Sequence, residues 1–166
     1  MSAPGLVIAF ALSVPCAGPE ATPWLTDFRD RVLAYDGLAA FVVAEMGPPT
    51  MCEGDVMTEF DGASYGALRL SFGTDVTLTV ETQPIETSIV TLRSEGGFAD
   101  PMKVDAALRD YATGIGVSID WEHGQASIEG EEEVTRFRDP DPGLNASAEL
   151  RRSEGRLLAI RFSMAL

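Results

Sequence analysis

Histidine, cysteine and lysine are scarce in this 166-residue chain, which contains one histidine, two cysteines and a single lysine. A structural zinc site takes four ligands, drawn mainly from cysteine and histidine at short spacings. Cys16 and Cys52 are far apart in the sequence, and His123 is the one histidine available to join them. The composition therefore argues against a zinc site, and we expect the protein to carry no metal and no cofactor.

Positive charge is also scarce, because 12 basic residues stand against 26 acidic ones and the net charge is −14. Such a surface repels nucleic-acid phosphates and anionic lipid headgroups. No stretch reaches the ~20 apolar residues that a transmembrane helix needs. We therefore expect no nucleic-acid partner and no membrane insertion. The acidic surface favours a basic protein as partner. The sequence leaves the oligomeric state open.

Residues 1–21 have two interpretations, a signal peptide or an N-terminal strand followed by a spacer. The apolar run 6–14 has the length of a leader's central region, but no lysine or arginine occurs before Arg29. The same run also fits a buried strand. The first interpretation, which we favour, places the protein in the periplasm or outside the cell, and the second leaves it in the cytoplasm. A disulfide between Cys16 and Cys52 requires that both are kept in an oxidising compartment.

Two segments have the sequence pattern of helices. Apolar residues recur every three or four positions in residues 23–46, which predicts one amphipathic helix with a weak point at Gly37. Residues 101–113 repeat the pattern, with Asp100 as the N-cap and Pro101 at the first helical position, where proline is tolerated. We expect both helices to cover the apolar face of a sheet.

Much of the remaining chain alternates between apolar and polar residues, as strands with one buried face do. This alternation, or a strand-like composition, occurs at residues 68–72, 76–81, 89–93, 117–122, 133–138, 148–150 and 158–164. The stretch SEGR is expected to turn a hairpin, and Glu131–Glu133 to be a solvated loop or sheet edge. The predicted fold class is α+β, with a mostly antiparallel sheet of about 6–7 strands packed against two helices in a two-layer domain spanning residues 22–166.

Four residues are weak candidates for catalysis. The stretch GASYG places Ser64 in the G-x-S-x-G pattern of a nucleophile elbow, although the residues after it alternate as a strand does. His123 is a candidate general acid or base, with Asp120 and Glu122 two residues apart on one face of a predicted strand. Because neither group is a complete catalytic set, an enzyme is the less favoured interpretation.

One loop has the oxygen-bearing side chains that a calcium ion prefers. Asp139, Asp141 and Asn145 lie in the proline-stiffened stretch DPDPGLN. An EF-hand-like loop also needs a glycine and a glutamate at fixed positions, where this chain has Leu144 and Leu150. We therefore expect a rigid turn here and no metal site.

No motif identifies a family, and the sequence leaves three hypotheses for function. The favoured one is a small, soluble, acidic binding protein, such as an accessory, inhibitor or immunity-type module, that contacts a partner protein. The second is a small hydrolase or acid/base enzyme that uses His123 with the neighbouring carboxylates. The third is an acidic cytosolic chaperone for a basic client.

Overall fold

The computed structural model describes residues 12–15, 23–54, 58–60, 63–83, 87–141 and 145–165. Its helices are α1 (Pro23–Tyr35), α2 (Gly37–Met46) and α3 (Pro101–Gly114). Its strands are β1 (Leu12–Pro15), β2 (Met51–Gly54), β3 (Thr58–Phe60), β4 (Ala63–Tyr65), β5 (Ala67–Phe72), β6 (Val76–Gln83), β7 (Thr87–Ser94), β8 (Gln125–Glu129), β9 (Glu132–Arg138), β10 (Asn145–Ser153) and β11 (Arg156–Ala165).

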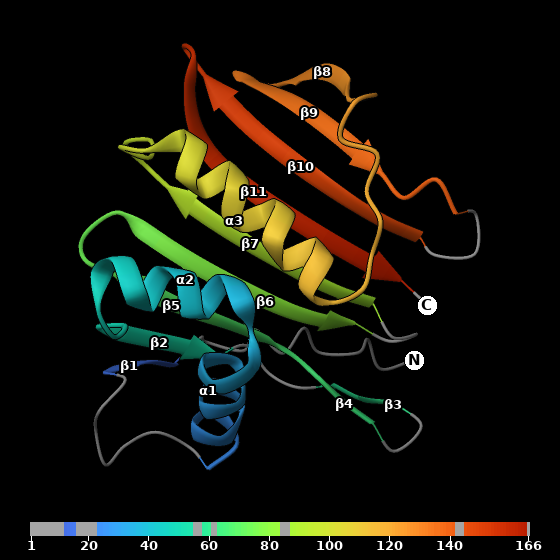
Figure 1. The fold of residues 1–166 in the computed structure, drawn as a ribbon. Coiled ribbons are helices and arrows are strands. Elements are labelled where there is room, and N and C mark those ends of the chain that lie inside the picture. The colour runs from blue at the N-terminus through green and yellow to red at the C-terminus, as the bar shows by residue number, and fades with distance from the viewer. Residues whose placement is uncertain are drawn as a thin grey trace, which may run out of the picture.

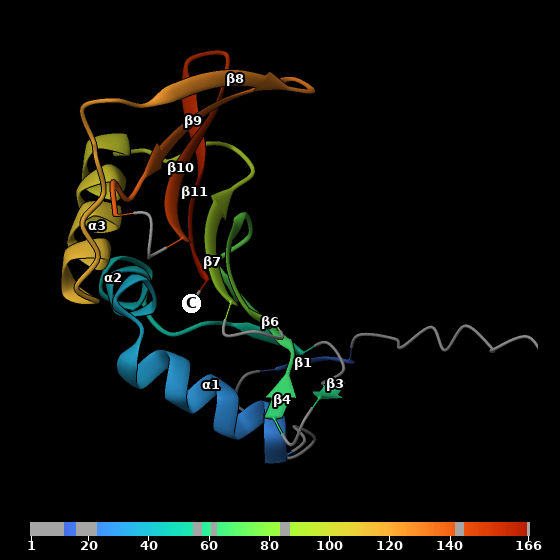
Figure 2. The same cartoon turned by 90° about the vertical axis from the view of Figure 1, so that its right-hand side faces the viewer.

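Nine of these strands form one antiparallel sheet, in the order β1-β2-β5-β6-β7-β11-β10-β9-β8, and β3 pairs with β4 separately. The described helices lie on one face of the sheet (Figure 1), and the view turned by 90° shows no helix on its other face (Figure 2). The predicted α+β class with an antiparallel sheet is confirmed, with more strands and one more helix than expected. None of the described helices is long and apolar enough to cross a membrane.

Apart from β1 and the inserted β3–β4 hairpin, the chain builds the sheet as two halves, in each of which one or two helices precede four strands. In the first half, α1 and α2 precede the meander β2-β5-β6-β7, and in the second half α3 precedes the meander β8-β9-β10-β11. Each meander ends at the centre of the sheet, where β7 and β11 pair antiparallel. The helix-facing side chains of these central strands are almost fully buried: Val90, Leu92, Ile160 and Phe162.

The predicted single helix at residues 23–46 is wrong, because the chain forms two helices that meet at Asp36. The backbone of Asp36 is extended (φ −81°, ψ 122°), and its carboxylate accepts a hydrogen bond from the Ala39 amide at 2.9 Å. Asp36 is therefore the N-cap of α2, while its own amide donates to the Val32 carbonyl at the end of α1. The apolar spacing keeps its phase across the break, so the spacing alone does not reveal it.

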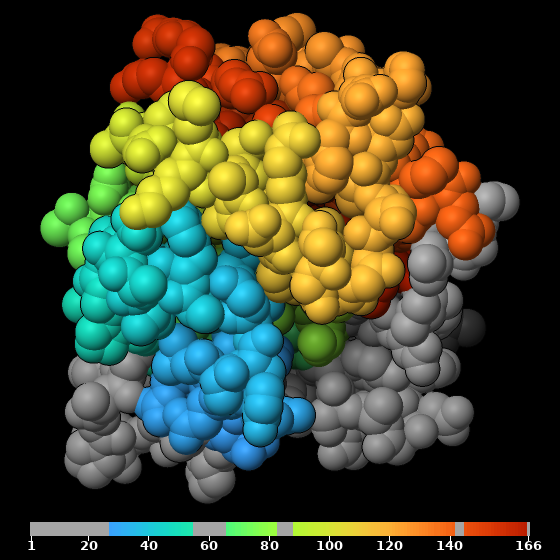
Figure 3. All heavy atoms as spheres, viewed as in Figure 1, coloured from blue at the N-terminus to red at the C-terminus, as the bar shows by residue number. Residues whose placement is uncertain are grey.

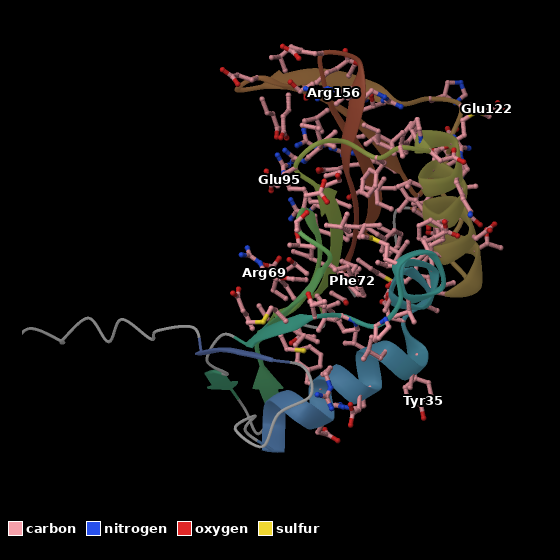
Figure 4. The ribbon with its side chains drawn as sticks, turned by 90° about the vertical axis from the view of Figure 1, so that its left-hand side faces the viewer. Tyr35, Arg69, Phe72, Glu95, Glu122 and Arg156 are labelled. Carbon is pink, nitrogen blue, oxygen red and sulfur yellow. The ribbon has the colours of Figure 1, made fainter. Side chains whose placement is uncertain are left out.

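The alternation predicted for the strands corresponds to one buried and one open face of the sheet. In β5, Leu68, Leu70 and Phe72 are fully buried, whereas Arg69 is exposed. Figure 4 shows Phe72 between the sheet and the helices, and Arg69 on the opposite side. The predicted hairpin is confirmed as well, since β10 and β11 are joined by a turn at 154–155 in which both residues have positive φ (52° and 77°).

Two regions differ from the predicted strands. Residues 117–122 alternate as expected, with Val117 and Ile119 buried, but they form an irregular strap and not a strand. A backbone hydrogen bond from Asp120 to the Arg138 carbonyl, at 2.9 Å, joins this strap to β9. The edge strand β8 is not among the strands predicted from the sequence, and all five of its side chains are exposed, including the apolar Ala126 and Ile128.

Part of the N-terminal apolar run lies at an edge of the sheet. β1 pairs antiparallel with β2, and Val14 is opposite Cys52. Cys52 is buried and disulfide-bonded. Residues 1–11 and 16–22, which include Cys16, lie outside the described residues. Whether residues 1–21 are removed stays a prediction, which the mass of the protein isolated from its host would decide.

Candidate functional site

The three predicted residues around His123 meet in a turn at the surface. The Nδ1 atom of His123 is 2.8 Å from Oδ2 of Asp120, and the two side chains are 78% and 39% exposed. The Asp120 carboxylate also accepts the Glu122 amide at 3.1 Å, and the hydrogen bond with His123 lowers the pKa of Asp120. Because residues 117–122 are not a strand, the carboxylates do not share a strand face. None of the three residues lines the two pockets described below.

Ser64 lies on β4, where its partner on β3 is Glu59. A nucleophile elbow needs a sharp turn between a strand and a helix. The stretch GASYG instead contributes one arm of a β-hairpin and continues into β5. The backbone at Ser64 therefore lacks the geometry of an elbow.

The predicted calcium candidates are arranged as a local turn. The Asp139 carboxylate accepts the Asp141 amide at 2.7 Å, and the Asp139 amide donates to the Ala146 carbonyl. Asn145 is exposed at the start of β10, and residues 142–144 lie outside the described residues. In the part of the chain that the structure describes, no group of three or more His, Cys, Asp or Glu residues is placed to hold a metal ion.

A pocket lies between α2, the start of α3 and the end of the sheet where β6 begins and β7 ends. Its volume is about 330 Å³, near the lower end of the range typical of ligand sites. The space-filling view shows α2 and α3 side by side at the surface of this face of the molecule (Figure 3). The apolar residues that line the pocket are Phe41, Val42, Met46, Val76, Leu92, Phe98, Ala99 and Val104.

Charged and polar side chains line the same pocket. Lys103 on α3 forms an ion pair with Glu45 on α2, and Asp100 caps α3 by accepting the Lys103 amide at 3.1 Å. At the end of the sheet, the hydroxyl of Ser94 is 3.5 Å from Oδ2 of Asp75. Three carboxylates and one ammonium make this lining negative. The described lining contains no histidine or cysteine.

A second hollow, of about 360 Å³, lies between the helices and includes the exposed Tyr35 and the half-buried Tyr111. Burial raises the pKa of Asp36, although hydrogen bonds from the Ala39 amide and from Tyr111 oppose the shift. Burial and the nearby Asp36 carboxylate also raise the pKa of Tyr111. These contacts join the α1–α2 junction to α3, so this region has an evident structural role.

The open face of the sheet carries a cluster of ion pairs. We call it the arginine–glutamate network, and its members are Arg93, Glu129, Glu132, Arg136, Glu149 and Arg151. Arg151 lies 2.9 Å from Glu149, 3.2 Å from Glu129 and 3.5 Å from Glu132. Arg136 pairs with Glu149 at 2.8 Å and also with Glu129, and Arg93 pairs with Glu132.

The arginines of the network favour the ionised form of its glutamates. A hydrogen bond from Arg136 is the main cause that lowers the pKa of Glu129. Burial alone would raise the pKa of Glu149, which is 8% exposed, but hydrogen bonds from Arg136 and Arg151 outweigh burial and the pKa is lowered. The network is therefore a fully charged cluster at neutral pH.

The predicted solvated position of Glu131–Glu133 is wrong for Glu132. Its side chain is 18% exposed, and the hydrogen bond from Arg93 is the main cause that lowers its pKa. The sequence gives no signal for this pair, because Arg93 and Glu132 lie 39 residues apart and meet only through the order of the strands.

The register of the strands extends this pattern across the open face. One row of paired positions runs from β2 to β8 through Glu53, Arg69, Thr79, Thr91, Arg161, Glu149, Arg136 and Gln125. Paired residues of neighbouring strands point to the same side of a sheet. Charges of both signs are mixed along this row, with three arginines and two glutamates.

The described structure thus has a negative pocket on the helix side and a balanced network on the open face. From the sequence, none of the pocket residues stands out for a function, because their types also suit core, cap, turn or helix-surface positions. In comparisons with known proteins, no family model, no curated protein and no solved structure matches this chain.

Proposed function

We propose that this protein is a binding module that contacts a partner through the pocket between α2, α3 and the end of the sheet. The observation that carries the proposal is the combination of an apolar lining with three carboxylates in a cavity of about 330 Å³. An apolar group of the partner would displace water from the lining, and the carboxylates would orient it.

The charge of the pocket favours a basic partner. Glu45, Asp75 and Asp100 outnumber Lys103, and the whole chain has the same sign of charge. Negative charge of this kind accelerates the approach of positively charged partners, and salt weakens this attraction. We therefore propose that the partner is a protein with basic residues beside its apolar contact.

The His123 region supports the enzyme hypothesis less well. The side chain of His123 is 78% exposed, and Asp120 holds it in a turn outside the pockets. A general base acts on a substrate that the protein positions within hydrogen-bond reach. The described structure offers such positioning at the pocket, which has no histidine.

The proposal can be tested by affinity capture from the native host with the intact protein and two variants. Ala99 is exposed and lines the pocket, so Ala99→Trp fills the pocket without replacing a buried side chain. Glu122→Gln is the control, because it removes one exposed carboxylate outside the pocket. We expect a partner that is captured by the wild type and the control, is released by salt and is lost with Ala99→Trp. A partner retained by Ala99→Trp would contradict the proposed site.

A further inference from the structure

We infer that the pocket takes a ligand group with an apolar body and a cationic end, and that the cation lies between Asp75 and Ser94. This inference rests on the proposed function, and it specifies the chemistry of what is bound. The cation belongs either to a free amine or to the side chain of a partner protein.

The buried hydroxyl of Ser94 is the first observation that points to a ligand. Ser94 is 2% exposed and lines the pocket, but its hydrogen bond to Asp75 Oδ2 is long, at 3.5 Å. Hydroxyl–oxygen bonds are usually about 2.7–2.8 Å long, and buried polar groups are normally well satisfied. A hydrogen-bond donor placed between the two side chains would complete the bonding of both.

The second observation is that Asp75 is the uncommitted carboxylate of the pocket. Glu45 is paired with Lys103, and the Asp100 side chain accepts the first-turn amide of α3. Within the described chain, Asp75 has no ion pair, and its backbone carbonyl rather than its side chain accepts the Glu95 amide. An ammonium or guanidinium group would give Asp75 a counter-ion, whereas an anion would meet an excess of negative charge.

The third observation is the apolar lining next to these two groups. Val76 adjoins Asp75 in the sequence, and Leu92 lies two residues before Ser94 on the same side of β7. Phe41, Phe98 and Val104 line the same cavity from α2, the loop before α3 and α3. An apolar group in this cavity would be held within reach of the carboxylate and the hydroxyl, so the site selects both parts of the ligand together.

The test uses probes that differ in charge and share their apolar part. We would titrate the ¹⁵N-labelled protein with 2-phenylethylammonium and with 3-phenylpropionate, and follow the amide signals of Ser94, Gly97 and Val104 by NMR. We expect the ammonium to bind at least about tenfold more tightly than the carboxylate, because it is attracted by Asp75 and the carboxylate is repelled. Asp75→Asn should remove most of that preference, and Glu122→Gln should preserve it.

A second pair of probes distinguishes the source of the cation. The dipeptides N-acetyl-Phe-Arg-amide and N-acetyl-Phe-Glu-amide present the same ring beside a side chain of either charge. Tighter binding of the Phe-Arg dipeptide than of the free amine would assign the site to a partner protein, and the reverse order would assign it to a small amine; both results support a cation site.

Two outcomes would overturn the inference in different ways. Equal binding of the cationic and anionic probes at the pocket would reject the cation site and leave the proposed binding function standing. No change at the pocket signals with any probe would reject both proposals. Ala99→Trp provides a check that does not alter Asp75, because it should abolish the response to every probe.

Discussion

Asp36 shows at the scale of one residue how a side chain decides the arrangement of three helices. Its carboxylate caps α2 and accepts a hydrogen bond from Tyr111 on α3, and its amide completes the end of α1. Its pKa is raised because burial outweighs these hydrogen bonds. The apolar spacing predicted the buried positions Val32, Ala39 and Val42, but it also placed the exposed Tyr35 on the buried stripe. It missed the break because Asp36 lies between two positions of the stripe.

The cap at Asp36 can be tested with two substitutions. Asp36→Ala removes the acceptor for the Ala39 amide, and we expect it to lower the free energy of unfolding by about 1–2 kcal/mol. Asp36→Asn keeps an acceptor and removes the charge that burial disfavours, so it should stay close to the wild type. Urea denaturation at neutral pH measures both. Equal losses in the two variants would show that the cap is not the source of stability.

The surface position of His123 leads to a second prediction. His123→Ala removes an exposed side chain with a local partner in Asp120, so we expect the melting temperature and the capture of a partner to be unchanged. Thermal unfolding and the capture assay check this. An unchanged melting temperature combined with loss of function would support the enzyme hypothesis in place of the binding module.

At the scale of elements, a strand can be predicted from the sequence where one of its faces is buried, and it is missed where neither face is buried. The alternation in β5 and β6 follows directly from a helix-covered and an open face. The edge strand β8 has no buried side chain, and although its sequence QASIE alternates, it offers only Ala126 and Ile128 as apolar positions, too few to indicate a strand. The strap at 117–122 shows the converse, because it alternates without being a strand: Val117 and Ile119 pack into the core, and the hydrogen bond from Asp120 to the Arg138 carbonyl ties it to β9.

The short link between the strap and β8 makes a tight contact at Gly124, which gives a third prediction. A Cβ atom at this position would lie 2.6 Å from Phe137 Cε1 and 2.8 Å from Thr135 Cγ2. We expect Gly124→Ala to destabilise the protein by about 1–3 kcal/mol, because buried Phe137 has to move. The matched control is Gly114→Ala at the end of α3, where a Cβ meets nothing within 4 Å. That change should raise stability by up to about 1 kcal/mol. Chemical denaturation of both variants checks the contrast.

At the scale of the whole molecule, the order of the strands places charges that are far apart in sequence into one network. The pairs Arg93–Glu132 and Arg136–Glu149 are separated by 39 and 13 residues. Sequence periodicity shows which side of a strand faces the core, but it does not show which strands are neighbours. The fold class was therefore predictable, whereas the network and the pocket required the pairing of β7 with β11 and the packing of α2 against α3.

The network gives the last prediction, which concerns stability against pH. Arg151→Met keeps the aliphatic stem and removes the charge that joins three glutamates, so we expect a loss of roughly 1–3 kcal/mol at pH 7, less than for a fully buried pair. Arg69→Met is the control, since the Arg69–Glu53 pair is 3.7 Å apart and more exposed, and it should change stability little.

The direction of the pH dependence follows from the lowered pKa values of Glu129, Glu132 and Glu149. A carboxylate whose pKa is lower in the folded than in the unfolded state stabilises the fold above its ordinary pKa, here 4.5, and this contribution is lost as the pH falls through the folded value. The difference between the wild type and Arg151→Met should therefore be largest at neutral pH and shrink towards about pH 3, as measured by urea denaturation across this range. A difference that stays constant down to that pH would mean that Arg151 stabilises the sheet by packing and not by charge, and the ion pairs would then contribute little to the fold.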